Sequence, residues 1–365
     1  MSVTSDHHSP ASGPTSGFRG TTHREPALLK TWLAGSHEPA IEPDLPIVDA
    51  HHHLWDDQRG RYLADEQLVD LDCGHNVVAT VYIEASSMYR ADAPPAMQPA
   101  GEVEFVNGIA AASASGRYGS KRLCAGIVGY ADMMLGNEVQ PVLEALQQAG
   151  NGRLRGIRYG VCWDTGDAVK FIRRQVPAHR LADPVFRQAF ARLAPLGLSF
   201  ESWQFYHQLP DLADLLRAFP QTSVILNHCG GVLGIPPHDN RQQVFEIWRR
   251  HIRELARFSN LTVKLGGLGM LYSNWDFHLR DKPPTSEELA DAWRPYIETC
   301  IEAFGPDRCM MESNFPVDKQ TCSYGVLWNA MKRITEHCAR SEKANLYMGT
   351  AVKAYRLEAI LPHAC

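Results

Sequence analysis

The sequence lacks the features that mark membrane, secreted and disulfide-rich proteins. No apolar run approaches the roughly 20 residues that a transmembrane helix needs. The N-terminus, MSVTSDHHSPASGPTSGF, has no apolar core of the kind found in a secretory signal. The 9 cysteines are an odd number and form no C-x-x-C pair, so a disulfide scaffold is not expected. We therefore expect a cytoplasmic protein whose thiols are reduced.

A strong charge of either sign is also missing. The chain has 36 Lys and Arg against 41 Asp and Glu, a formal net charge of −5. So small and dispersed an excess does not favour nucleic acid or an anionic membrane as a partner. Hydrophobic residues make up 44% of the 365 positions, enough for a sizeable core. These values favour a globular protein that binds a small molecule, and they leave a homo-oligomer open.

The chain divides into a short tail and one long domain. Residues 1–26 are rich in Ser, Thr, His, Gly and Pro and show no hydrophobic period, which predicts a disordered or docked tail outside the core. Deleting this tail should leave the melting temperature nearly unchanged. No repeat or Gly/Ser-rich linker interrupts residues 27–365, so they are expected to form a single domain.

Short apolar runs alternate with helix-compatible segments through this domain. Each run resembles a strand buried on both faces; together they span residues 46–50, 77–84, 124–130, 154–161, 198–203, 223–228, 261–265 and 309–314. Between two of the runs, Asp183-Pro184 supplies a helix N-cap followed by proline at the first helical position. Eight strands alternating with helices favour an α/β fold of the (β/α)₈ TIM barrel type. The alternation alone leaves a doubly wound sheet as a rival, and the chemistry at the strand ends decides between them.

Histidines gather at the ends of two of these runs. His51 and His53 are two residues apart, so on an extended backbone both rings project to one face while His52 points away. His228 ends the run at 223–228 and is followed by two glycines. Active sites in TIM barrels lie at the carboxyl ends of the strands. We expect these three imidazoles to share one pocket and to bind a divalent cation or a substrate carboxylate.

Further polar residues interrupt the apolar runs. In the last run Glu312 and Asn314 share one face by the two-residue period. A buried charge without a partner is very costly. The charged residues of the other runs, Glu84, Arg158 and Lys264, should therefore form a paired cluster in the barrel. Glu201 is less certain, because the alternation around it is weak. An inert salt-bridge layer is the alternative for Glu84 and Lys264. The aromatic loop that carries Tyr272 and Trp275 is predicted to cover the barrel mouth and contact substrate.

With these residues in view, the chain resembles the amidohydrolase superfamily, and within it the amidohydrolase 2 branch of lactonase-like and decarboxylase-like barrels. The resemblance runs from Pro46 to the end of the chain. It is carried by four blocks in strand context: DAHHHLWD at 49–56, RGIR at 155–158, ILNHCG at 225–230 and FGPDRCMMESNFPV at 304–317. It implies a (β/α)₈ barrel with hydrolytic chemistry. It also maps His51 and His53 onto the family's first-strand pair and His228 onto its sixth-strand histidine.

Two departures from the family pattern bear on the mechanism. The family usually has Ser-Asp-x-Pro on strand eight, whereas this chain has Ser313-Asn314-Phe-Pro, and an amide cannot act as a general base. The run at 198–203 also lacks the histidine found in metal-binding relatives, and His207 follows it in an expected loop. His51, His53 and His228 could still hold zinc or manganese with water, while lactonase-like relatives work without metal. The resemblance therefore leaves two alternatives, one divalent cation or none.

The predicted function is hydrolysis of a small lactone or ester that carries a carboxylate. His51, His53 and Arg158 or Lys264 would orient the substrate and stabilise the oxyanion. Glu312 or His228 would take the proton of the attacking water, and Asn314 would position water or substrate. The alternatives are a metal-dependent decarboxylase of an aromatic or muconate-type acid and a non-catalytic ligand-binding barrel.

Overall fold

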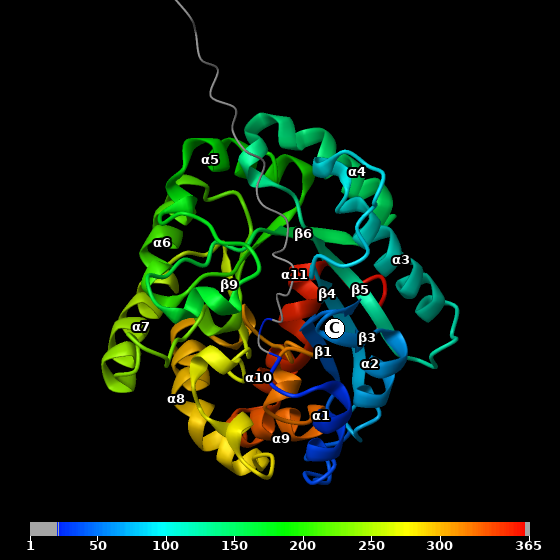
Figure 1. Ribbon diagram of the computed structural model, residues 1–365, viewed down its shortest axis with the longest axis vertical. Helices are drawn as coiled ribbons and strands as arrows, with labels where there is room; N and C mark the ends of the chain where they lie inside the picture. Colours follow the sequence, from blue (N-terminus) through cyan, green and yellow to red (C-terminus); the bar gives the residue numbers. More distant parts are fainter. Residues whose placement is uncertain (1–19, 21, 362–365) are drawn as a thin grey trace, which may run out of the picture.

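Eight parallel strands form the centre of the molecule. The computed structural model describes residues 20 and 22–361. In order around the sheet the strands are β1 (Ile47–His52), β4 (Val77–Ile83), β5 (Arg122–Gly129), β6 (Leu154–Arg158), β7 (Ser199–Ser202), β8 (Val224–Leu226), β9 (Leu261–Leu265) and β10 (Cys309–Met311). Each predicted run overlaps one strand, and Figure 1 shows them inside a ring of helices. The expected (β/α)₈ barrel is confirmed.

Helices follow the strands and cover the outside of the barrel (Figure 1). They are α2 (Ala64–Leu71), α3 (Ala100–Ala114), α4 (Gln140–Gly150), α5 (Pro184–Phe190), α6 (Leu209–Ala218), α7 (Arg241–Leu255), α8 (Ser286–Phe304) and α9 (Tyr324–Ile334). The predicted start of α5 is confirmed, since the Asp183 side chain accepts a hydrogen bond from Val185 N at 2.8 Å. The fold therefore brings every βα loop to the same end of the barrel.

The barrel closes where the chain leaves β10 and passes beside β1. Asn314 N donates to His51 O at 2.9 Å, and His53 N donates to Phe315 O at 2.8 Å. The Ser313 hydroxyl donates to Asp49 Oδ2 at 2.6 Å. These bonds join the two ends of the sheet and place the histidines of β1 next to the residues that follow β10.

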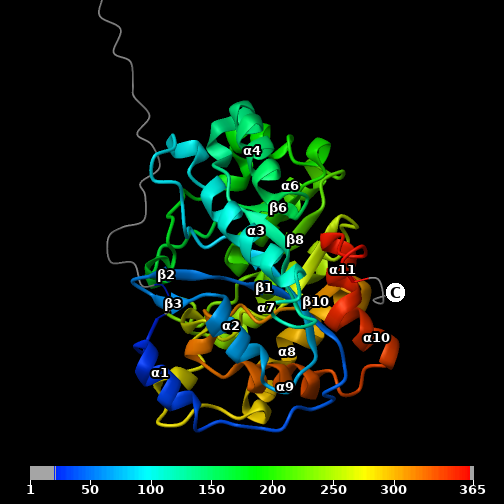
Figure 2. The same ribbon diagram turned by 90° about the vertical axis from the view of Figure 1, so that its right-hand side faces the viewer.

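The lumen of the barrel has an apolar floor. Val48, Val81, Ile225 and Met310 belong to one apolar cluster with α11 (Thr350–Tyr355) and its neighbours. Two further elements, α1 (Pro26–Leu33) and the hairpin β2 (Trp55–Asp57) and β3 (Gly60–Tyr62), lie on the opposite side of the molecule from α11, as Figure 2 shows. The short helix α10 (Arg340–Ala344) precedes α11 in the chain. Because α11 closes one end, ligands must reach the lumen from the other.

The described end of the predicted tail is in contact with the domain. Residues 1–19 and 21 of that tail lie outside the described residues. His23 N and Arg24 N both donate to Gln320 Oε1, and Arg24 Nη1 donates to His278 O at 2.5 Å. At this end two backbone donors and a guanidinium find acceptors on the barrel, and whether the tail as a whole is docked or disordered stays a prediction.

No disulfide scaffold was expected from the sequence, and the eight cysteines in the described part of the chain are free. Between residues 22 and 361 no helix combines the length and apolar character needed to cross a bilayer.

Candidate active site at the carboxyl ends of the strands

A cavity of about 1090 Å³ opens at the end of the barrel where the βα loops meet. Its inner end is lined by His53, Glu84, Arg158, His228 and Asn314, all of which the sequence had indicated. They come from five different strand ends, as expected for an active site in this fold. We call this end of the cavity the inner lobe.

His51 and His53 point to one face of β1, as their spacing predicts. Their Nε2 atoms lie 3.1 Å apart, and His53 Nδ1 lies 2.8 Å from Ile83 O. His52 points away, and its Nε2 lies 2.9 Å from Thr80 Oγ1. Burial and then the charge of Lys264 hold the pKa of His51 well below its ordinary value, so its ring is neutral near pH 7.

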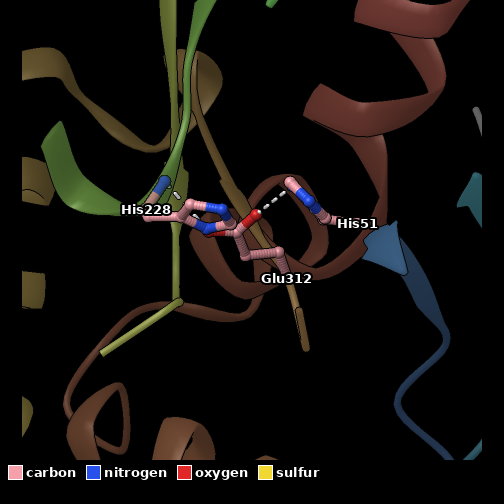
Figure 3. A group of neighbouring side chains, drawn as sticks. All are labelled: His51, His228 and Glu312. Carbon is pink, nitrogen blue, oxygen red and sulfur yellow. Dashed lines mark hydrogen bonds and ion pairs between the residues drawn. The ribbon is translucent and has the colours of Figure 1, made fainter. Parts of the chain in front are cut away.

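Glu312 lies between His51 and His228 (Figure 3). Its Oε1 accepts from His228 Nδ1 at 2.8 Å and from His228 N at 3.1 Å, and its Oε2 is 2.9 Å from His51 Nδ1. Since Nδ1 of His228 donates to the carboxylate, Nε2 of the neutral ring keeps a lone pair. Glu312 is fully buried whereas His228 lines the cavity, so the imidazole stands between the carboxylate and any substrate.

A tight turn after β8 brings His228 into this position. The residue lies just past the strand with a φ of 55°, in the left-handed region. Gly267, which follows β9, packs against the ring, and a Cβ atom there would lie 2.4 Å from His228 Nδ1. Only glycine allows this approach. The expectation of a strand residue is therefore corrected to a turn residue that still reaches the strand ends.

Lys264 and Glu201 form a buried ion pair beneath the histidines. Lys264 Nζ lies 2.9 Å from Glu201 Oε2 and 3.2 Å from His51 Nδ1, with both charged side chains fully buried. Glu201 also accepts hydrogen bonds from Asn227 and Tyr355. Burial lowers the pKa of Lys264, an effect that the charges of Glu201 and Glu312 oppose. Among the described residues, neither Lys264 nor His51 lines the cavity. The structure therefore places both beneath the surface that substrate would contact, and of the three histidines expected to share the pocket only His53 and His228 line it.

Arg158 links the histidines to Glu84. Its Nε donates to Glu84 Oε1 at 2.9 Å, and its Nη1 lies 3.3 Å from His51 Nε2. A second guanidinium, that of Arg174, lies 3.5 Å from Glu84 Oε2. Burial alone would raise the pKa of Glu84, but these two charges bring it below the ordinary value. Glu84 is thus a carboxylate near pH 7, held in place by two arginines.

Three arginines at the cavity were missed by the sequence analysis. Arg59, Arg173 and Arg174 all line it. Arg59 pairs with Asp57 at 2.6 Å and lies over the ring of Trp55. None of the three lies on a barrel strand, so the two-residue period that located Arg158 does not apply to them. Their place in the loops after barrel strands β1 and β6 was the available signal.

Asn314 is oriented by the carboxyl group of Asp318, a residue to which sequence reasoning gave no role. Its Nδ2 donates to Asp318 Oδ1 at 2.8 Å, and Asp318 Oδ2 accepts from Gly269 N at 2.9 Å. Burial raises the pKa of Asp318 to about 8. Because Nδ2 of Asn314 is directed to Asp318, its Oδ1 is the atom left for the cavity, where it acts as an acceptor.

The two aromatic residues predicted to contact substrate lie in different places. Tyr272 lines the cavity and is nearly fully buried. Trp275 is not among the described lining residues; its ring packs against Arg241, whose Cζ lies 3.8 Å from the ring centroid. His207 lies in the loop after β7, as expected, and its Nε2 is 3.0 Å from Trp163 O.

Two groups of side chains among the described residues could hold a metal ion. In the inner group the ligand atoms of His51, His228 and Glu312 lie within 4.8 Å of one another. The second group is Asp164, His207 and His238, in loops away from the inner lobe. His53, which the sequence analysis included as a ligand, lies beside the inner group with its Nε2 facing that of His51.

Comparison with known proteins supports the assignment of the fold. The chain is 33% identical over 336 residues to the uncharacterized protein y4mH of Sinorhizobium fredii, covering 86% of this chain and 99% of that protein. It is 24% identical to an L-fucono-1,5-lactonase of Burkholderia multivorans, covering 85% and 96% of the two chains. A crystal structure of an amidohydrolase from Burkholderia multivorans with bound zinc superposes with a TM-score of 0.62 at 21% identity, covering 85% of this chain and 99% of that one.

The amidohydrolase family matches residues 48–357, which is most of the chain and includes every residue of the inner lobe. The match confirms the resemblance seen in the four sequence blocks. With the barrel, the family match and the lactonase relatives in agreement, an enzyme is supported over a non-catalytic binding barrel. The chain belongs to the amidohydrolase family, in the branch whose members include lactonase-like and decarboxylase-like enzymes.

Proposed function

We propose that this enzyme hydrolyses a small lactone or ester that carries a carboxylate. The observation that carries the proposal is the His228–Glu312 pair, which presents an imidazole to the cavity next to Arg158. A histidine held by a buried carboxylate is a general base whose protonated form is stabilised by the adjacent charge.

The charges around the inner lobe support an anionic substrate. Four guanidinium groups lie at or near it, against three carboxylates; they are Arg59, Arg158, Arg173 and Arg174, with Asp57, Glu84 and, behind His228, Glu312. The cationic excess favours a substrate carboxylate, which guanidinium groups bind through paired hydrogen bonds.

His228 would activate the attacking water. In this mechanism Nε2 takes a proton from water as the oxygen attacks the carbonyl carbon, and the imidazolium then returns that proton to the leaving alkoxide when the ester C–O bond breaks. Asn314 Oδ1 would accept the second hydrogen of the water. Arg158 would donate to the oxyanion that develops on the carbonyl oxygen. Glu312 acts through His228 and is therefore a positioning residue.

His51, His228 and Glu312 also fit a divalent cation. Two imidazoles and a carboxylate suit zinc or manganese. The buried Glu312 Oε2 forms no hydrogen bond within the described residues, although His51 Nδ1 lies 2.9 Å from it. When bound, such an ion would polarise the carbonyl and lower the pKa of water. Lys264 and Arg158 already face the two nitrogens of His51, and their charges oppose a second cation there. Elemental analysis and turnover before and after chelation would separate a cation-assisted enzyme from a cation-free one.

Substitution of His228 tests the proposal. Turnover of a panel of carboxylate-bearing lactones should fall by about 10²–10⁴-fold in His228→Gln, with KM changed much less. His337→Gln, at an exposed histidine, is the matched control and should behave like wild type. Near-normal turnover by His228→Gln would remove this residue as the base.

Decarboxylation of an aromatic or muconate-type acid is the second candidate. The observation that favours it is the same His51, His228 and Glu312 donor group, because this reaction needs the cation to bind the substrate. Release of CO₂ from a panel of such acids, abolished by chelation, would identify this activity in place of hydrolysis.

A further inference from the structure

The cavity continues well beyond the inner lobe. Its outer part, which we call the outer lobe, is lined by α1, β3, α2, the loop after α2 and α9. Its apolar lining residues include Leu29, Leu33, Tyr62, Val69, Cys73 and Val326, and charged side chains such as Lys30, Glu38, Arg61 and Asp72 also border it. Drug-sized ligands occupy pockets of about 300–1,000 Å³, and the whole cavity measures about 1090 Å³. A small lactone bound at the histidines would leave most of this space unfilled.

The helix α1 covers the outer lobe with an apolar face. Leu29 and Leu33 are one helical turn apart and only 6% and 8% exposed. Among the described residues, neither leucine belongs to the two apolar clusters that form the core of the barrel. One hydrogen bond from the helix to the barrel runs from Trp32 Nε1 to Arg280 O at 3.0 Å. The apolar side of the helix therefore faces the cavity instead of packing into the core.

The opposite wall of the outer lobe is also apolar. Tyr62 and Val326 are buried members of the barrel core, and Cys73 packs against it. Val69 lies at the rim and is 74% exposed. The nearby charges of Lys319 and Asp70 neutralise each other at 2.6 Å. The outer lobe thus combines apolar walls with charges that include two ion pairs, Lys319 with Asp70 and Arg61 with Glu66, whereas the inner lobe has an excess of cationic groups.

We propose that the outer lobe binds an apolar substituent, an alkyl or aryl group, carried by the acid part of the substrate. The substrate would then be amphiphilic, with its carboxylate and ester at the arginines and histidines and its substituent between α1 and α9. The assignment of the ester end rests on the proposed function. The apolar subsite itself rests on the leucines of α1 and the wall opposite them.

Binding of straight-chain carboxylates tests the outer lobe without requiring turnover. Each methylene group that enters an apolar site should tighten binding about fourfold, so we expect octanoate to bind the full-length protein at least 30-fold more tightly than butyrate in isothermal titration calorimetry. 1-Octanol should bind more weakly than octanoate because it lacks the anionic head. Equal affinities for butyrate and octanoate would overturn the proposal.

Substitutions in α1 locate the binding. Leu29→Gln and Leu33→Gln should each weaken octanoate binding by about 5–20-fold and leave acetate binding unchanged. Leu28→Gln is the matched control, since Leu28 lies on the same helix and is 65% exposed. Leu33→Met conserves volume and should retain tight octanoate binding, which separates loss of the subsite from loss of the helix. Unchanged octanoate binding in both glutamine variants would place the ligand elsewhere and contradict the proposal.

The two proposals fail in different ways. If no lactone or ester is turned over but affinity still rises with chain length and falls in Leu33→Gln, the proposed hydrolysis is wrong and the apolar subsite stands. If lactones are turned over at rates that do not depend on substituent length and carboxylate affinities are flat, hydrolysis stands and the apolar subsite is wrong.

Discussion

At the scale of single residues, the position of Glu312 behind His228 makes it the most informative carboxylate to change. Glu312→Gln keeps an acceptor for His228 Nδ1 but removes the charge that stabilises the imidazolium (Figure 3). We expect kcat to fall by about 10²–10⁴-fold with KM little changed.

The control for this variant is Glu358→Gln, at an exposed glutamate of the C-terminal segment. It should match wild type in kcat and in stability. Circular dichroism should show that Glu312→Gln is folded. If Glu312→Gln turns over substrate normally, the His228–Glu312 pair is not the catalytic base system.

The residues of the site were predictable only where strand geometry applies. His51 and His53 follow the two-residue period, and the structure brings their Nε2 atoms to 3.1 Å. His228 and Asn314 have φ values of 55° and 54°, so the period no longer describes which way they point. For this reason the pairing of Glu312 with His228 could not be read from the sequence. The arginines of the loops have no period at all.

At the scale of secondary-structure elements, each strand was predictable because it is a short apolar run. The contacts between side chains of different strands inside the barrel were not predictable. Glu201 comes from β7 and Lys264 from β9, with β8 between them. The sequence indicated that Lys264 needed a partner and left Glu201 uncertain. The two charges meet because β8 pairs with both β7 and β9 and both side chains turn to the same face of the sheet, and this strand order cannot be read from a local sequence pattern.

This ion pair should contribute a large coupling energy between β7 and β9. Lys264→Met leaves the Glu201 carboxylate buried and uncompensated, so we expect a loss of about 3–5 kcal/mol in the free energy of unfolding. The double variant Lys264→Met/Glu201→Gln should lose much less than the sum of the single variants. Urea unfolding of the four proteins in a double-mutant cycle measures the coupling.

An exposed pair gives the reference for that cycle. Lys170 and Asp167 lie 2.7 Å apart with both side chains more than 60% exposed. Their coupling, from Lys170→Met and Asp167→Asn, should be below about 1 kcal/mol. A coupling energy for Lys264 and Glu201 no larger than this reference would show that the buried pair is not a structural link between the strands.

At the scale of the whole molecule, buried titratable groups of opposite kinds set the pH at which the fold is most stable. His51, His53 and His75 have lowered pKa values, chiefly through burial. The unfolded chain therefore binds more protons than the folded one below pH of about 6.5, and stability falls as the pH drops. Burial raises the pKa of Glu102 to about 7 and that of Asp318 to about 8. These groups keep protons that the unfolded chain has already lost, so their contribution to stability falls as the pH rises.

Between pH 6.5 and 8 the contribution of Asp318 should dominate. In the unfolded chain this carboxyl is already ionised, whereas in the folded protein it keeps its proton until the pH passes about 8. The folded state thus binds more protons, and stability falls with rising pH by up to about 1.4 kcal/mol per unit. We expect the melting temperature to drop by several degrees from pH 6.5 to 8. Asp318→Asn should remove most of this drop, and the exposed control Asp281→Asn should retain it. A melting temperature that stays constant or rises over this interval in the wild-type protein would show that Asp318 is ionised in the fold, with its charge held by Asn314 and the backbone of Gly269.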